Sequence, residues 1–370
     1  MRTVFHVCAD RGIDPAGTKG ASIHLRSIAT ALAGQCTVVM LAARTSATEL
    51  IGDNGATVPV ERLDGPASIV AAAQRYGTPT AVYERYSLGS SAGLEAARSL
   101  GCPFVLEVNA PLQMEASRHR PETVDEETAA IEATLIASAD VVIAVSHPLR
   151  DHLGPLRGGA PIVVVPNGCD PTAFAGGPRP DHRPTIGFLG HPKPWHGADR
   201  LVPLLAGVRH HGIDARLLLV GGGDGADQVA AAAAAAGLAD SVDITGALGH
   251  HAAAAAIASA WVGVAPYHPE EFFYFCPLKV VEYMAAGVPV VASSLGDIPW
   301  LVGDAGTLVG AHDLDALVDE TTRLLADPAT RAAMGGRGRD RALRDLTWDA
   351  AAAATLAAID QVSHGRPELS

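Results

Sequence analysis

The chain has 370 residues, a length that suits two domains of about 150–200 residues better than one core. Hydrophobic residues make up 48% and charged residues 18%, which excludes a disordered chain, and no apolar run approaches the ~20 residues of a membrane span. A net charge of −13 without a long basic run argues against nucleic acid as a partner and does not favour an anionic membrane surface.

Apolar runs of strand length alternate with helical patterns along the whole chain. In the first half they lie at residues 3–8, 37–42, 81–85, 104–108, 141–145 and 162–165. In the second half they lie at residues 185–189, 216–220, 242–245, 262–266 and 288–292. Runs such as VVIAV and RLLLV are typical of parallel strands buried on both faces. The pattern predicts the α/β class, with two doubly wound domains facing across a cleft and a boundary in the Gly/Pro-rich segment 173–184.

The N-terminus indicates a first strand and not a secretory leader. The five cysteines are scattered without metal-binding spacing, which is typical of structural thiols in a reducing compartment. We therefore expect a cytoplasmic protein with no metal site.

Only three of the 27 basic side chains are lysines, and each lies in a loop rich in Gly or Pro. Lys19 lies in GTKG, Lys193 in HPKPWHG and Lys279 in FCPLK. Each loop connects a predicted strand to a predicted helix, the first of which begins after Gly20. Free backbone N–H groups at such helix starts attract anions. Together the loops suit a ligand with two phosphates and a hydroxylated sugar, although the first could be a plain glycine turn and the second a solvated loop.

The third loop leads into the segment PLKVVEYMAAGVPVVAS. Pro277 suits the first helical turn, and Gly287 followed by Pro289 ends the helix. Lys279 and Glu282 share a helix face, so one interpretation is a surface salt bridge. The apolar neighbours of Glu282 indicate instead a partly enclosed carboxylate that can accept hydrogen bonds from a diol.

Three other motifs resemble known ligand-binding patterns. Residues 221–226 form a GxGxxA pattern with Asp243 further on, which is the dinucleotide fingerprint, but it follows the second strand of its domain and not the first. The pairs His210–His211 and His250–His251 lack metal-ligand spacing. Asp313 and Asp315 form a DxD pattern that we interpret as helix capping.

The block EYMAAGVPVV, preceded by VPNGCDPTAF and GFLGHPKPWHG, resembles the retaining family-four glycosyltransferases of the GT-B fold. GTKGASIHLRSIATAL and LEVNAPL also look like that family's N-terminal loops, so the resemblance covers nearly the whole chain. It implies an N-terminal acceptor domain at residues 1–175, a C-terminal nucleotide-sugar domain at 183–345 and a last helix, 346–370, that crosses back to the first domain. It also implies retention of anomeric configuration without a metal, with an oxygen of the donor phosphate taking the acceptor proton.

The resemblance assigns roles to particular residues of the donor side. Glu282 matches the second Glu of the EX7E motif, which binds the ribose hydroxyls, whereas Tyr274 stands where the first Glu is expected. Glu270 and Glu271 lie nearby in the chain and could supply the missing carboxylate. Leu278 and Lys279 match the helix start that meets the diphosphate. His191 and His196 stand at the positions of the usual diphosphate-binding Arg and Lys, and Lys193 lies between them.

In the N-terminal domain, Gly20 matches a donor-binding glycine near the diphosphate, and Asn109, which we expect to be catalytic, occupies a position usually held by a His near the reacting sugar. Lys19, His24, Arg85 and Glu107 are the residues we expect to bind the acceptor. The substrates implied are a UDP-linked sugar and a small-molecule or saccharide hydroxyl, with no cofactor and with a homodimer left open. The alternatives are an NAD-dependent α/β enzyme and a non-catalytic sugar-nucleotide binding protein.

Overall fold

The computed structural model describes residues 2–17 and 19–363. The chain divides into two compact units, which are unit 1 (Met1–Asn167 and Trp348–Ser370) and unit 2 (Gly168–Thr347). The division falls ahead of the expected linker at 173–184. The reason is that Cys169 N–H donates to the Leu346 carbonyl at 2.8 Å, so the segment entering unit 2 pairs with the segment leaving it.

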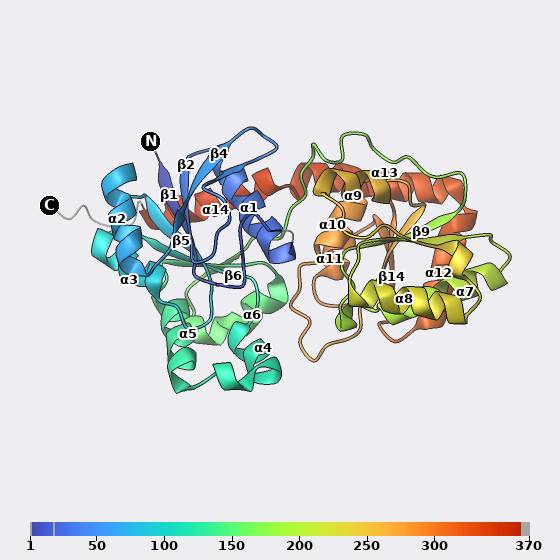
Figure 1. Ribbon diagram of the computed structural model, residues 1–370, viewed down its shortest axis with the longest axis horizontal. Helices are drawn as coiled ribbons and strands as arrows, with labels where there is room; N and C mark the ends of the chain where they lie inside the picture. The colour runs from blue at the N-terminus through green and yellow to red at the C-terminus, as the bar shows by residue number, and fades with distance from the viewer. Residues whose placement is uncertain (1, 18, 364–370) are drawn as a thin grey trace. The chain divides into compact units, whose positions relative to one another are not determined.

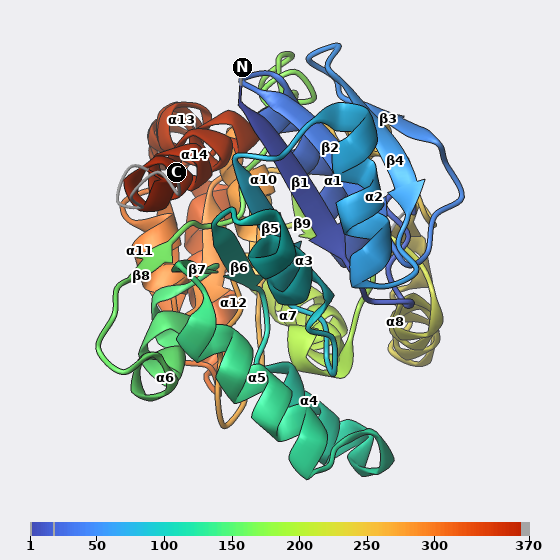
Figure 2. The same ribbon diagram turned by 90° about the vertical axis from the view of Figure 1, so that its left-hand side faces the viewer.

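The strands of unit 1 form one sheet in the order β3-β4-β2-β1-β5-β6-β7-β8. Their bounds are β1 (Thr3–Cys8), β2 (Thr37–Ala42), β3 (Glu49–Ile51), β4 (Thr57–Arg62), β5 (Ala81–Arg85), β6 (Phe104–Val108), β7 (Val141–Ala144) and β8 (Ile162–Val164). Figure 2 shows these strands side by side, from β4 through β1 to β7. All pairings are parallel except that of β3 with β4.

Strands β3 and β4 were not predicted from the sequence. β3 is the edge strand of the sheet, and β4 lies next to it, between β3 and β2. β4 carries Pro59, which cannot donate a ladder hydrogen bond and interrupts the sequence pattern of a strand. Strands as short as β3 leave too few residues for a periodic pattern.

The helices of unit 1 connect these strands. They are α1 (Gly20–Ala33), α2 (Pro66–Tyr76), α3 (Ala92–Leu100), α4 (Leu112–His119), the 3-10 turn η1 (Pro121–Thr123), α5 (Glu126–Ser138), α6 (His147–Arg157) and α14 (Trp348–Ser363). The last helix, α14, packs against α1, as Figure 1 shows, so the chain returns to unit 1 after completing unit 2. The end of the expected segment 346–370, residues 364–370, lies outside the described residues.

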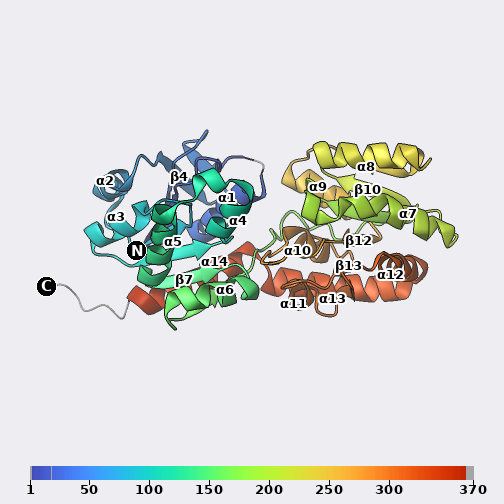
Figure 3. The ribbon, with the colours of Figure 1, turned by 90° about the horizontal axis from the view of Figure 1, so that it is seen from below.

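Unit 2 holds a second parallel sheet in the order β11-β10-β9-β12-β13-β14. Its strands are β9 (Thr185–Leu189), β10 (Arg216–Val220), β11 (Val242–Ile244), β12 (Val262–Ala265), β13 (Val290–Ser293) and β14 (Gly306–Val309), the last of which was not predicted. Figure 3 follows this order from β10 through β12 to β13. Apolar side chains of these strands and of the helices α7 (Leu201–His210) and α12 (Leu314–Ala326) form the core, including Ile186, Leu205, Leu219, Val264 and Leu324.

The remaining elements complete unit 2. They are η2 (Pro194–His196), η3 (Ala198–Arg200), α7 (Leu201–His210), α8 (Asp224–Ala235), η4 (Ala239–Ser241), α9 (His250–Ile257), α10 (Leu278–Ala285), α11 (Ile298–Val302), α12 (Leu314–Ala326) and α13 (Pro328–Asp345). Among the described residues, no helix combines the length and the apolar character that crossing a membrane requires.

In both units the strand order reverses beside the first strand. In unit 1 β1 lies between β2 and β5, and in unit 2 β9 lies between β10 and β12. Because the crossovers are right-handed, the helices that follow two adjacent strands at this point lie on opposite faces of the sheet. Ligands of doubly wound sheets bind at the carboxyl ends of those two strands. Each unit therefore has one preferred ligand edge.

Candidate functional site

The ligand edge of unit 2 is organised by α10. Its hydrophobic face is buried through Val280, Val281 and Met284, which fixes the helix against the sheet. Pro277 is the N-cap of this helix and not part of its first turn as predicted. Leu278 and Lys279 form the first turn, where the free backbone N–H groups favour an anion.

Glu282 lies one turn into α10 and is partly enclosed, as expected. Its Oε1 lies 3.2 Å from Nε2 of His250, the first residue of α9. The two side chains are 17% and 26% exposed, so a ligand can still reach the carboxylate. The alternative interpretation, a surface salt bridge with Lys279, does not hold, because the partner of Glu282 is His250 on α9. His250 was not predicted as a site residue.

Lys279 is buried, and its Nζ has no hydrogen-bond partner among the described residues. The ammonium lies 3.9 Å from the ring centroid of Phe188 and 5.2 Å from that of Tyr267. Burial lowers the pKa of Lys279 to about 7, and the nearby Glu282 only partly offsets this effect.

The loop after β9 carries the other predicted donor residues. His191 is exposed, and its Nδ1 lies 2.7 Å from the Gly222 carbonyl, which joins this loop to the turn after β10. His196 Nδ1 lies 3.2 Å from both the His191 carbonyl and the Lys193 N–H. Burial, reinforced by Lys279, lowers the pKa of His196 to about 3, so its imidazole is neutral near pH 7. Lys193 is exposed, and two 3-10 turns, not an α-helix, follow it directly.

An aromatic cluster, which the sequence analysis did not identify, occupies the segment before α10. The rings of Trp195 and Phe275 are stacked, with their centroids 6.2 Å apart. The centroids of the Phe275 and Tyr274 rings are 4.3 Å apart. Tyr274, at the position of the expected Glu, is buried in this cluster. Glu270 and Glu271 are both exposed and precede it. The run of four aromatic residues at 272–275, FFYF, was the sequence feature that could have predicted this cluster.

In unit 1, α1 begins at Gly20 itself, slightly earlier than predicted, with Lys19 as its exposed N-cap. A side chain at Gly20 would meet no atom within 4 Å, so the backbone here is open to approach. Arg26 Nη1 donates to the Pro15 and Gly17 carbonyls at 3.0 and 3.1 Å and anchors the loop from behind.

Four predicted residues of unit 1 form a connected polar network. His24 Nε2 lies 3.0 Å from Glu107 Oε1, and Asn109 Nδ2 donates to the same oxygen at 3.1 Å. Arg85 Nη1 lies 3.1 Å from His24 Nδ1. Burial alone would raise the pKa of Glu107, but His24 and Arg85 outweigh burial and hold that pKa well below its usual range. Glu107 is therefore an ionised, buried anchor and does not suit a general base.

A pocket of about 680 Å³ lies at the carboxyl edge of the unit 1 sheet. The segments that follow β1, β2, β4 and β5 supply much of its wall. Its charged lining residues are Asp10, Arg11, Arg62, Asp64, Glu95 and Arg120. Arg62 pairs with Asp64 at 2.9 Å, whereas Arg11 and Arg120 have no carboxylate partner within the described part of the chain. None of these residues was singled out from the sequence.

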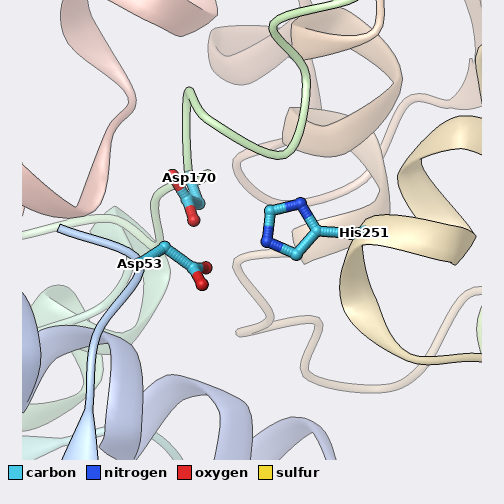
Figure 4. A group of neighbouring side chains, drawn as sticks. All are labelled: Asp53, Asp170 and His251. Atoms are coloured by element: carbon cyan, nitrogen blue, oxygen red, sulfur yellow. The ribbon is translucent and has the colours of Figure 1, made fainter. Parts of the chain in front are cut away.

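The competing motifs have structural explanations. The turn at 221–226 follows β10, the second strand of its unit. The dinucleotide fingerprint belongs to the turn after the first strand, so this turn does not match it. Asp313 caps α12, because its Oδ1 accepts from the Ala316 N–H at 2.8 Å. Figure 4 draws Asp53, Asp170 and His251, which have the chemistry of metal ligands. Asp53 belongs to unit 1 and the other two to unit 2, so they are not assigned as a site of either unit.

Comparison with known proteins identifies the family. Residues 18–173 match the model of Glycosyltransferase Family 4, and residues 183–327 match that of Glycosyl transferases group 1. A D-inositol 3-phosphate glycosyltransferase of Actinosynnema mirum is 29% identical over 310 residues, which cover 76% of this chain and 72% of the relative. A GDP-mannose-dependent alpha-(1-6)-phosphatidylinositol monomannoside mannosyltransferase of Mycolicibacterium smegmatis is 32% identical over 228 residues, covering 57% and 59%.

Solved structures agree on the fold. Sucrose-phosphate synthase of Thermosynechococcus elongatus superposes with a TM-score of 0.80 at 22% identity, covering 99% of this chain and 100% of that one. Anabaena HepE in complex with UDP has a TM-score of 0.74 at 18% identity, covering 98% and 100%. The predicted GT-B architecture of two α/β units is thus confirmed. The chain belongs to the family 4 glycosyltransferases and is a glycosyl-transferring enzyme.

Proposed function

We propose that the enzyme moves a sugar from a nucleoside diphosphate sugar, with UDP as the first nucleotide to test, onto a hydroxyl of a small-molecule or saccharide acceptor. GDP is the second nucleotide to test, because one mannosyltransferase relative is named as GDP-mannose-dependent. The observation that carries the proposal is the ligand edge of unit 2. There Glu282, partly enclosed beside His250, adjoins the N-terminal turn of α10, which combines a diol acceptor with an anion site.

We propose that the reaction retains the anomeric configuration. The bond from the anomeric carbon to the diphosphate oxygen breaks as the bond from that carbon to the acceptor oxygen forms. The acceptor proton passes to an oxygen of the leaving diphosphate. The enzyme then contributes positioning and stabilisation of the negative charge, and needs neither a protein base nor a metal.

Acceptor binding is assigned in this proposal to the 680 Å³ pocket of unit 1 and the network of His24, Arg85, Glu107 and Asn109. The guanidinium groups of Arg11 and Arg120, which have no carboxylate partner among the described residues, favour an acceptor that carries an anionic group. The inositol phosphate in the names of several relatives has this chemistry. We therefore propose a polyol phosphate as the first acceptor class to test.

The test is transfer by the purified enzyme from UDP-glucose, UDP-N-acetylglucosamine and GDP-mannose to inositol and inositol phosphate. Released nucleotide reports turnover, and proton NMR of the product reports anomeric configuration. Thermal-shift screening with UDP, GDP, ADP and NAD addresses the alternatives, because a ligand that binds only the native state raises the melting temperature. A shift with NAD alone would favour the NAD-dependent alternative over the proposal, and an inverted product would overturn the retaining mechanism.

A further inference from the structure

The first turn of α10 carries the buried amine of Lys279, next to the point where strands β9 and β12 of the unit 2 sheet stop pairing. Strands β9 and β12 pair only through Ile186 with Val262 and Gly187 with Gly263. Beyond these pairs the strands are bridged by the Tyr283 hydroxyl, which accepts from the Leu189 N–H at 2.9 Å and donates to the Val264 carbonyl at 3.1 Å. This opening is the point where the strand order reverses, and ligands of doubly wound sheets bind there.

Lys279 lies on the same face of α10 as Tyr283, four residues earlier, and its ammonium is placed at this opening. Phe188, the penultimate residue of β9, and Tyr267, which follows β12, flank the ammonium with their rings. The residue is only 7% exposed, and Nζ makes no hydrogen bond among the described residues. The carboxylate on the same helix, Glu282, contacts His250 instead.

A buried ammonium without a counter-ion is costly, and two aromatic rings offset only part of the lost hydration. Such a group normally has a partner, and here an anionic ligand would provide it. The free N–H groups of the first turn of α10 favour an anion at the same point. The three features converge on one ligand group.

We propose that the Lys279 side chain binds the diphosphate of the nucleotide directly and takes up a proton from solvent when the nucleotide binds. The proposal rests on the proposed function, since it needs a nucleotide at the ligand edge of unit 2. It assigns the buried charge of the donor site to Lys279 and leaves the exposed Lys193 as a second, solvated cation.

The proton uptake follows from the surroundings of the amine. The titratable groups that face it are Glu282 on its own helix, His196 from the loop after β9 and Tyr267 after β12. In the empty site burial holds the pKa of Lys279 at about 7, so at pH 8 most molecules carry a neutral amine. A bound diphosphate favours the ammonium and moves that pKa back towards its ordinary value.

The experiment is isothermal titration with UDP and with GDP at pH 8, in phosphate and in Tris, whose different ionisation enthalpies report the protons exchanged. We expect uptake of nearly one proton per site. At this pH His196, with a pKa of about 3, contributes little. Lys279→Met should lose the uptake and bind roughly tenfold to hundredfold more weakly. The matched control Lys193→Met should keep the uptake, because Lys193 is exposed.

Lys279→Met removes a buried charge without changing the side-chain length greatly, so its melting temperature without ligand should equal or exceed that of the wild type. A second readout needs no variant at the site. The chain has three lysines, so ¹³Cε-lysine labelling gives three signals, and Lys19→Arg and Lys193→Arg assign them. The Lys279 signal should titrate near pH 7 in the free enzyme and lose that transition with UDP bound.

Two failures are distinguishable. Nucleotide binding with unchanged proton uptake in Lys279→Met, or a Lys279 signal that ignores UDP, would overturn this inference and leave the proposed function standing. Absence of any binding of UDP, GDP or ADP to the wild type would overturn both.

Discussion

Glu282 Oε1 lies 3.2 Å from Nε2 of His250, so the carboxylate of α10 has its partner on α9 and not on its own helix. The contact orients one carboxylate oxygen and leaves Lys279, three residues earlier, without a hydrogen-bonded counter-ion among the described residues.

Replacing Glu282 with Gln should weaken nucleotide binding tenfold to hundredfold with the fold intact. A carboxylate accepts two hydroxyl hydrogen bonds, whereas the amide offers one acceptor atom, and charge-assisted bonds contribute roughly 1.5–3 kcal/mol. Titration calorimetry with UDP and GDP measures the loss. Glu320→Gln on α12, which removes only a surface pair with Arg323, is the control. Unchanged affinity in Glu282→Gln would reduce Glu282 to a structural partner of His250.

Lys193→Ala should lower turnover more than it lowers the affinity for free nucleotide. Charge develops on the leaving diphosphate, so a solvated cation nearby matters most in the transition state. Because the pKa of His196 is about 3, that histidine does not supply the charge near pH 7. A pH–rate profile of wild type beside Lys193→Ala checks this. Wild-type turnover of the variant at every pH would remove Lys193 from the site.

Transfer should continue in excess EDTA. The helix N-terminus of α10 and the lysines can stabilise the diphosphate charge, so the mechanism proposed above needs no divalent ion. Initial rates with and without chelator, followed by addition of Mg²⁺ or Mn²⁺, make the test. Complete loss with EDTA and recovery with metal would contradict the metal-independent mechanism.

Glu84→Gln should stabilise the enzyme increasingly as pH rises from about 4.5 to about 8. Burial raises the pKa of Glu84 to about 8 from 4.5, so over this window the folded state holds a proton that the unfolded state releases. The wild type therefore loses stability with rising pH, by about 1.4 kcal/mol per pH unit. The Gln oxygen can still accept from the Gly93 N–H, as Glu84 Oε2 does at 3.1 Å.

Urea midpoints of wild type and Glu84→Gln at pH 5 and pH 8 give the comparison. The two midpoints should be similar at pH 5 and separate at pH 8, with the variant higher. A constant difference between them at both values would show that Glu84 ionises in the folded state as it does in the unfolded one.

Gly197→Ala should destabilise unit 2 strongly. Gly197 has a φ of 68°, and an added Cβ would collide with the carbonyl oxygen of Pro266. Gly212→Ala is the matched control, because Gly212 has a φ of 85° but open space around it. The control measures backbone strain alone, about 1 kcal/mol. Equal melting temperatures of the two variants would show that the loop after β9 can shift away from the Pro266 carbonyl and avoid the collision.

Local sequence patterns determined the α/β class, most strands and the positions of the three lysine loops. Buried parallel strands such as Arg216–Val220 are apolar on both faces, and helices such as α10 end where Gly287 and Pro289 require it, so each signal is contained in a few neighbouring residues. Strands β3 and β4 lacked this signal, since β3 is very short and Pro59 interrupts β4.

Tertiary structure alone decided the partners of the site residues. The pairing of Glu282 with His250 joins residues 32 positions apart, and the rings around Lys279 come from β9 and from the segment after β12. The pocket of unit 1 is assembled from loops that follow four separate strands. The spacing of residues along the chain does not encode such contacts. The order of the strands in each sheet decides which loops become neighbours, and these neighbours set the burial and the charged surroundings of each side chain.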